Sequence, residues 1–456
     1  MAALILTAGL LLSCGMNGTA AQTETDIEDP ADITGNTATD APEVTENDIS
    51  ASDGTGSVTE SAAAPEITET ESSVIESSVI ESPLTESSAS DIAGDTGAAE
   101  SSITETDAAP YTPQSPAAHT FWRDRLETPG ERAAYDSFAA MVDELSDTAV
   151  FSEPIGFDGL SRVFRFFSLD HPEFFWGSGG YTATGRSDNA VSARISGAPG
   201  RDALSAMRSD IERAADSVLS AIPRDADEFE IEKAIFDWLW SNVRYDVSAP
   251  DAYSVYGALV GRRCVCEGFS EAFQYLCTRA GIETTSITGH ADNGRTTDGH
   301  KWNAVRLSGK WYTVDPTWAV GAESYRYLYF NESGYISRSH SPDADTAGLL
   351  PDFSAKDMSY LNYYRLNFTD ADFDEAFIRA LAKFSPLADG GGIATVLMRA
   401  ESPDAASRYA DIISTDRARI SNLTREFGKI SGAEYAVAGS AGVVYDSVIF
   451  FSIYKK

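Results

Sequence analysis

Cys266, His300 and Asp315 are the residues of this chain whose types and spacing could together carry out acyl transfer. Cys266 stands just before a helical pattern, in which the apolar residues recur at three- and four-residue spacing: Phe269, Ala272, Phe273, Leu276, Cys277 and Ala280. The spacing predicts that Cys266 lies in the first helical turn, where free N–H groups and the helix dipole favour a thiolate. A cysteine in that position is suited to act as a nucleophile.

A base for this cysteine is predicted by the segment 299–318, which has the pattern of a β-hairpin with a two-residue turn at 308–309. In the register that this turn sets, Trp302 lies opposite Asp315. His300 is then a diagonal neighbour of Asp315 on the same face, at roughly 7–8 Å between backbones. An imidazole and a carboxylate can meet across that distance, so the register predicts a His–Asp pair beside the cysteine helix.

Two residues compete for these roles. His290 could be the base, but it lies outside the hairpin register that brings His300 to Asp315. Cys264 could be the nucleophile, but it precedes the predicted helix. Cys277 falls on the apolar stripe of that helix and is interpreted as a buried core thiol.

Three ordered motifs carry a family resemblance. The stretches Val265–Ser270, His300–Asn303 and Trp311–Trp318 resemble the transglutaminase-like superfamily, over roughly residues 225–335. The resemblance implies an α+β, papain-like fold, in which the cysteine helix packs on an antiparallel sheet. It also implies roles for the three residues named first: Cys266 as nucleophile, His300 as acid/base and Asp315 as the orienting carboxylate. It implies no metal and no cofactor.

Two aromatic residues are candidates for the substrate groove, Tyr245 and Trp302. Tyr245 resembles an aromatic position that precedes the cysteine segment in the family. A core tyrosine with a satisfied hydroxyl explains Tyr245 equally well.

The N-terminus predicts export. Residues 1–14 are a short apolar run that ends in Leu11-Leu12-Ser13-Cys14, which resembles a lipoprotein signal with Cys14 as the lipidated residue. The basic residues expected at the start of such a signal are missing. We expect a lipid anchor on the outer face of the cytoplasmic membrane, with an ordinary signal peptide and a secreted protein as the alternative.

Residues 15–118 contain no Lys or Arg and hold 22 acidic residues in a background of Ser, Thr, Ala, Pro and Gly. This composition predicts a disordered acidic linker, because it cannot bury a core. The rest of the chain, with 48 acidic and 34 basic residues, keeps a net charge of −14 out of the total of −36. No basic stripe occurs, which argues against nucleic-acid binding.

The folded part is predicted as two units. Residues 119–340 would form the transglutaminase-like domain with an N-terminal helical and aromatic extension, and residues 341–456 a small α/β unit that carries no chemical motif. Within them the patterns predict several elements beyond the hairpin: helices near 202–222, 228–243, 370–385 and 403–427, a polar loop at 290–299, and strands near 325–331, 393–398, 434–439 and 443–453.

These features together favour an exported cysteine enzyme that acts on amide bonds of proteins or peptides, as a peptidase, deamidase or transamidase. The backbone N–H of Cys266 would help to bind the oxyanion. The alternative is a surface module that keeps the fold and uses its aromatic groove for binding. The sequence leaves the oligomeric state open.

Overall fold

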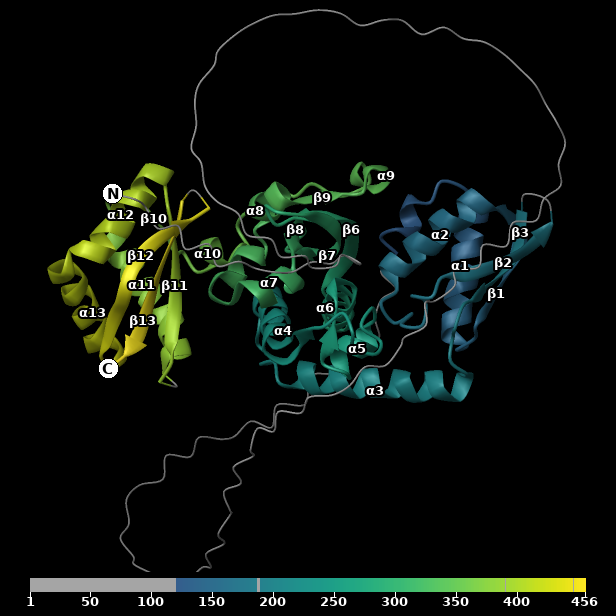
Figure 1. Ribbon diagram of the computed structural model, residues 1–456, viewed down its shortest axis with the longest axis horizontal. Coiled ribbons are helices and arrows are strands. Elements are labelled where there is room, and N and C mark those ends of the chain that lie inside the picture. The colour runs from purple at the N-terminus through teal and green to yellow at the C-terminus, as the bar shows by residue number, and fades with distance from the viewer. Residues whose placement is uncertain (1–119, 187–188, 390, 446) are drawn as a thin grey trace, which may run out of the picture. The chain divides into compact units, whose positions relative to one another are not determined.

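The computed structural model describes residues 120–456, except 187, 188, 390 and 446. Cys14 and the linker 15–118 lie outside the described residues, so their predicted roles are not addressed by the structure. Within the described residues the chain mixes helices and sheets, as the α+β prediction required (Figure 1). None of the described helices has the length and apolar character needed to cross a membrane.

The N-terminal extension pairs two helices with a small antiparallel sheet. Its first helix begins with a capping box, in which the Thr128 side chain accepts the N–H of Glu131 and the Glu131 carboxylate accepts the N–H of Thr128. The three strands are ordered β1-β3-β2. The elements are η1 (Arg123–Arg125), α1 (Pro129–Asp143), β1 (Thr148–Gly156), α2 (Phe157–Asp170), β2 (Tyr181–Arg186) and β3 (Asn189–Ile195).

Asp170, at the end of α2, holds Trp122, and Trp122 links this extension to the central sheet. The Asp170 carboxylate accepts the backbone N–H groups of Trp122, at 3.0 and 3.1 Å, and of Arg123, at 3.0 Å, and the hydroxyl of Tyr135, at 2.8 Å. The indole N–H of Trp122 donates to the Ser286 carbonyl in the central sheet at 3.2 Å. Trp122 is therefore buried without an unsatisfied hydrogen-bond donor, because its backbone and indole N–H groups are both paired.

The central sheet is antiparallel with the order β8-β7-β6-β9. Its strands are β6 (Glu283–Asp292), β7 (Thr297–Leu307), β8 (Lys310–Val314) and β9 (His340–Pro342). The predicted hairpin register is confirmed, since Leu307 pairs with Lys310 and Asn303 with Val314. Ser308 and Gly309 have φ values of +49° and +82°, the double left-handed turn that matches strand twist.

The cysteine helix α6 (Cys266–Arg279) packs on this sheet (Figure 1). Its predicted apolar stripe is buried, with Phe269, Phe273 and Leu276 all at 0% exposure. Gly268 explains the glycine of the cysteine motif: a Cβ there would lie 2.6 Å from the Cys264 Cβ and 2.8 Å from the Ala252 carbonyl. Any larger residue would push the first turn of α6 away from its neighbours.

Short elements and further helices surround α6 and the sheet. Two two-residue strands pair in parallel, with Tyr245 opposite Cys264. These elements are α3 (Arg201–Ser220), α4 (Glu228–Asn242), β4 (Arg244–Tyr245), α5 (Val255–Leu259), β5 (Arg263–Cys264), α7 (Pro316–Ala322), η2 (Glu323–Tyr329), α8 (Ser333–Ser339) and α9 (Ala344–Ala347).

The C-terminal unit is a four-stranded sheet, ordered β10-β11-β13-β12, with helices packed against it. The stretch predicted as a helix near 403–427 forms two helices, because α12 ends at Thr415 and α13 begins at Arg417. The elements are α10 (Tyr360–Tyr363), β10 (Asn367–Phe368), α11 (Phe373–Phe384), η3 (Ser385–Ala388), β11 (Ile393–Ala400), α12 (Pro403–Thr415), α13 (Arg417–Ser431), β12 (Tyr435–Val444) and β13 (Val448–Lys455).

Three predictions about the chain's organisation need correction. The domain boundary at 340/341 is wrong, because it cuts through β9, which pairs with β6. It would also assign Asp343 to the C-terminal unit, although the Asp343 N–H donates to the Thr288 carbonyl of β6. The polar loop at 290–299 is mostly strand, since β6 and β7 continue past the polar residues and leave only a tight turn. Residues 325–331 are largely η2, because aromatic side chains there pack on the core without a partner strand beyond a single bridge at Phe330.

Candidate active site

Asp315 stands at the junction of β8 and α7 and is fully buried. One carboxylate oxygen, Oδ1, accepts the backbone N–H of Thr317 at 2.9 Å and of Trp318 at 3.1 Å. These are the free N–H groups of the first turn of α7, so Asp315 caps this helix, and Pro316 takes the first helical position, where no N–H is needed. The Asp-Pro-Thr-Trp motif is thus a helix start that fixes one oxygen and leaves the other for the site.

The other oxygen, Oδ2, contacts His300. The His300 Nε2 lies 2.8 Å from Asp315 Oδ2, as the hairpin register predicted. Burial raises the pKa of the Asp315 carboxyl, but the adjacent imidazoles of His300 and His340 outweigh burial and hold the pKa well below its usual range. The carboxylate is therefore charged, and His300 must donate from Nε2, which leaves its Nδ1 as the nitrogen that can exchange a proton with a substrate or nucleophile.

His340 is a second histidine on the same oxygen, which sequence reasoning missed. Its Nε2 lies 2.9 Å from Asp315 Oδ2, and its side chain is 1% exposed. His340 lies outside all three motifs and comes 25 residues after Asp315. Only the pairing of β9 with β6, in which His340 faces Ala291, brings it to the site. No local pattern in the sequence signals that pairing.

Cys266 is the first residue of α6 and is 8% exposed. The residue before it, Val265, has extended backbone and offers no side-chain cap, so no N-cap side chain competes for the N–H groups of this turn. The first turn of α6 faces the start of β7, because Lys301 Nζ lies 3.5 Å from the carboxylate of Glu267. The immediate chain neighbours of Cys266 and His300 are thus in contact.

The other two cysteines within the described residues do not suit catalysis. Cys264 and Cys277 are both at 0% exposure, and burial raises the pKa of each thiol well above its ordinary value. A thiol in such surroundings stays protonated and inert. These features agree with the interpretation of Cys277 as a core thiol and leave Cys264 without a catalytic role.

A small cleft opens at His300. Among its lining residues are Tyr245, Asp298, Thr317 and Trp318. Tyr245 thus lies beside His300, and its role in a substrate groove stays a prediction. Trp302, by contrast, is 2% exposed and lies parallel to the His300 ring, with centroids 6.0 Å apart. The groove prediction for Trp302 is wrong. Trp302 shares the face of β7 with His300 but is buried in the core, and the half-buried Trp318 is the tryptophan that lines the cleft.

His290 does not replace His300. It pairs with Gly299 in the sheet, and its side chain is 56% exposed. The nearest carboxylate that it approaches is Asp343, at 3.9 Å, on β9's side of the sheet. Among the described residues, His300 and not His290 is thus the histidine of β6 and β7 that contacts Asp315.

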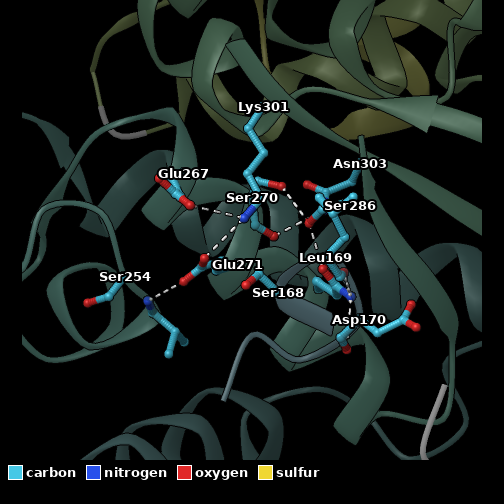
Figure 2. A network of polar contacts seen from close by, with 12 residues as sticks. Ser168, Leu169, Asp170, Ser254, Glu267, Ser270, Glu271, Ser286, Lys301 and Asn303 are labelled. Atoms are coloured by element: carbon cyan, nitrogen blue, oxygen red, sulfur yellow. Dashed lines mark hydrogen bonds and ion pairs between the residues drawn. The ribbon is translucent and has the colours of Figure 1, made fainter. Parts of the chain in front are cut away.

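The opposite face of β7 carries a second buried polar cluster, shown in Figure 2. Lys301 Nζ donates to Glu271 at 3.0 Å and approaches Glu267 at 3.5 Å, and Glu271 also accepts the N–H of Val255 at 3.1 Å. Two carboxylates share one ammonium, so burial, reinforced by the charge of Glu267, raises the pKa of Glu271 to about 7 despite Lys301. No local pattern among the motifs predicts this cluster.

The two histidines and Asp315 are also the kind of group that can bind a metal, since their ligand atoms all lie within 4.8 Å of one another. The two nitrogen–oxygen separations of 2.8 and 2.9 Å match charge-assisted hydrogen bonds. A metal would require both Nε2 atoms to lose the protons that these bonds use. The geometry therefore fits a hydrogen-bonded carboxylate better than a ligand set.

Comparison with known proteins agrees with the motifs and this fold. Residues 217–316 match the model of the transglutaminase-like superfamily, so the chain contains a transglutaminase-like core. Kyphoscoliosis peptidase from Mus musculus is 25% identical over 201 residues, covering 39% of this chain and 30% of the relative. The Homo sapiens kyphoscoliosis peptidase is 25% identical over 214 residues, covering 41% of this chain and 32% of the relative. The matched part is thus about a third of those proteins.

Two solved structures overlap the chain in part. A candidate cysteine protease from Cytophaga hutchinsonii is 24% identical over a match that covers 24% of this chain and 37% of the protease chain, with a TM-score of 0.21. A TGase structure is 14% identical and covers 37% of this chain and 50% of its own, with a TM-score of 0.23.

Proposed function

We propose that this protein is a cysteine acyl-transfer enzyme that acts on amide bonds of proteins or peptides. Cys266 is the nucleophile, His300 the acid and base, and Asp315 the carboxylate that orients His300. The observation that carries the proposal is the His300–Asp315 hydrogen bond of 2.8 Å, beside the helix that begins at Cys266. Such a pair leaves one imidazole nitrogen in a fixed direction, which general acid–base catalysis requires.

The proposed reaction has two balanced halves. The Cys266 thiolate attacks the amide carbonyl carbon, a C–S bond forms, and the carbonyl electron pair moves to the oxygen. The N–H groups of the first turn of α6 can stabilise that oxyanion. The C–N bond then breaks as the His300 imidazolium gives its proton to the leaving amine. In the second half His300 takes a proton from water or an amine, which attacks the thioester and releases the Cys266 thiolate.

Among the possible reactions we favour peptide hydrolysis. Support comes from the two relatives, which are named peptidases, although they share only part of their length with this chain. An incoming amine in place of water would give transamidation with the same residues. In this proposal the scissile amide would lie in the cleft beside His300, between the half-buried Tyr245 and Trp318.

We also propose that the enzyme is exported and held at the membrane by a lipid on Cys14, with the acidic tract as a spacer. The support is the Leu-Leu-Ser-Cys box at 11–14, followed by 22 acidic residues without a Lys or Arg. Mass spectrometry of the N-terminal peptide of the protein purified from its membrane fraction tests this. A diacylglyceryl-modified Cys14 is expected, and an unmodified N-terminus at another residue would contradict it.

The catalytic proposal can be tested before any substrate is known, by alkylation with iodoacetamide across pH. Wild type should react at Cys266 well below pH 8.5, the ordinary thiol value, because the thiolate is paired with His300. Cys266→Ala should lose this reaction, His300→Ala should shift it to the pH of an ordinary thiol, and Cys277→Ala should keep it. If wild type reacts only as an ordinary thiol, the protein is better described as a binding module on the same fold.

A further inference from the structure

His340 holds a place in the site that neither the motifs nor the comparisons assign. We propose that His340 is a positioning residue: its ring N–H fixes the Asp315 carboxylate and shares the charge that Asp315 offers to His300. The effect on chemistry rests on the proposed function, because it acts through His300. The hydrogen bond itself does not, and it can be tested separately.

The donor count assigns the protons. Asp315 Oδ2 has the two ring nitrogens at 2.8 and 2.9 Å, and a carboxylate can only accept. Both Nε2 atoms must therefore carry hydrogen. The remaining nitrogen of His340, Nδ1, lies 3.1 Å from the Ile336 carbonyl and 2.9 Å from the Ser339 hydroxyl. Both nitrogens of His340 are engaged within the protein, so His340 cannot act as the base itself.

The same contacts fix the carboxylate in place. Asp315 accepts two backbone N–H groups from α7 on one oxygen and two imidazoles on the other. Four donors from three separate segments leave the carboxylate no other orientation. His340 is the donor that comes from the far side of the sheet, so it opposes rotation of Asp315 away from His300.

Because His300 and His340 share one oxygen of Asp315, His340 also weakens the electrostatic interaction between Asp315 and His300. Two donors on one oxygen each receive less of its negative charge than a single donor would. His340 therefore limits how strongly Asp315 stabilises the His300 imidazolium. Without His340, the full charge would act on His300, and the imidazolium should persist to higher pH.

Other titratable groups near His300 do not explain such an effect. Tyr245 and Asp298 line the same cleft, and Cys266 lies on α6. The charged cluster of Lys301, Glu267 and Glu271 lies on the opposite face of β7. The imidazoles of His300 and His340 are the side chains whose hydrogen bonds to Asp315 the described part of the chain records.

The experiment measures the rate of Cys266 alkylation by iodoacetate across pH. Iodoacetate is an anion, so its rate should fall when the His300 imidazolium loses its proton, and the falling limb reports that loss. We expect His340→Phe, which fills the space without a donor, to move this limb up by about one pH unit and to lower the maximal rate about tenfold. His340→Gln, which keeps an N–H donor, should stay close to wild type.

Outcomes that differ from these overturn the proposal in a recognisable way. If His340→Phe lowers the melting temperature but leaves the limb in place, His340 is only a packing residue. Nitrogen NMR of ¹⁵N-histidine-labelled wild type tests the bond without any variant: the His340 Nε2 should carry hydrogen at every pH at which the protein is folded, and an unprotonated Nε2 contradicts the proposal. A wild type that shows no limb at all would count against the proposed function, while the NMR result would still decide the His340–Asp315 bond.

Discussion

The two faces of β7 bury charge in opposite ways. On one face, a single carboxylate, Asp315, lies between the two imidazoles of His300 and His340. On the other face, a single ammonium, Lys301, lies between the two carboxylates of Glu267 and Glu271. Adjacent residues of one strand, His300 and Lys301, thus enter clusters of opposite composition.

The difference shows in the carboxyl groups. The Asp315 carboxylate accepts four hydrogen bonds, and its pKa is lowered. Glu271 shares the ammonium of Lys301 with Glu267, and its pKa is raised to about 7. A carboxylate that must orient a base has to stay charged over the working pH range, and Asp315 meets that condition. Both carboxyl groups are buried, so the ratio of donors to acceptors decides which of the two remains ionised.

The largest effect is expected from removing the shared carboxylate. Asp315→Ala leaves two buried imidazoles and two N–H groups of α7 without their acceptor, which should lower the free energy of unfolding by about 3–5 kcal/mol. Urea unfolding of wild type and variant measures this. The matched control is Thr313→Val, a substitution at a buried residue of β8 that does not hydrogen-bond to Asp315 or the histidines. An equal loss of unfolding free energy in both variants would mean that the hydrogen bonds of Asp315 do not stabilise the fold.

Removing the shared ammonium should have the next largest effect, and the effect should depend on pH. Lys301→Met leaves Glu271 and Glu267 without a cation, so we expect a loss of about 3 kcal/mol at pH 8. The loss should shrink at pH 5, because protonation of Glu271 removes the uncompensated charge. Unfolding curves at the two pH values check this, and a loss that is the same at both would show that the charge cluster does not control stability here.

A smaller effect is expected from Glu271→Gln. The pKa of Glu271 in the folded state, about 7, lies above the ordinary value of about 4.3, so the folded protein binds the proton more tightly than the unfolded chain. The contribution of Glu271 to stability is therefore fully present below about pH 4 and is lost as pH rises to about 7. Between pH 5 and pH 7 the difference in unfolding free energy between variant and wild type should move by about 2 kcal/mol in favour of the variant. A difference that stays flat with pH would contradict the raised pKa.

The smallest effect is expected from Glu267→Gln. The Glu267 side chain is 37% exposed and lies 3.5 Å from Lys301, so water already screens the pair. We expect a change in unfolding free energy below about 1 kcal/mol. Glu267 borders Cys266, however, and removing its negative charge should modestly favour the thiolate and speed alkylation. A loss of stability as large as that of Lys301→Met would mean that both carboxylates hold the ammonium equally.

Part of the site could be predicted from the sequence because it depends on local rules. The two-residue turn at 308–309 fixes the register of one hairpin, and with it the meeting of His300 and Asp315. The helical spacing after Cys266 fixes that residue at a helix start. Alternation along β7 could not have excluded Trp302 from the groove, since Trp302 lies on the same face as His300 and only its depth in the core separates the two.

Other parts depended on contacts between segments far apart in the chain. The strand β9 has three residues, too few for a recognisable alternation of polar and apolar side chains. Its pairing with β6 nevertheless brings His340 to Asp315 and places residues 340–342 in the central sheet. Gly289 permits this pairing, because a Cβ there would overlap the Ser341 carbonyl and lie 2.8 Å from the Pro342 Cα. Residues 325–331 have the composition of a strand but become a 3-10 helix, since the edge of the sheet offers them only one bridge.

The helix that starts at Cys266, the hairpin register and the His300–Asp315 pair can be predicted from the sequence, since each follows from a spacing of a few residues. Packing between distant segments brings a second histidine to Asp315, buries Lys301 between two carboxylates, and makes Trp318 rather than Trp302 line the cleft. Local spacing is enough to set turns and strand faces, whereas the charged groups that meet on one face depend on contacts between segments far apart in the chain.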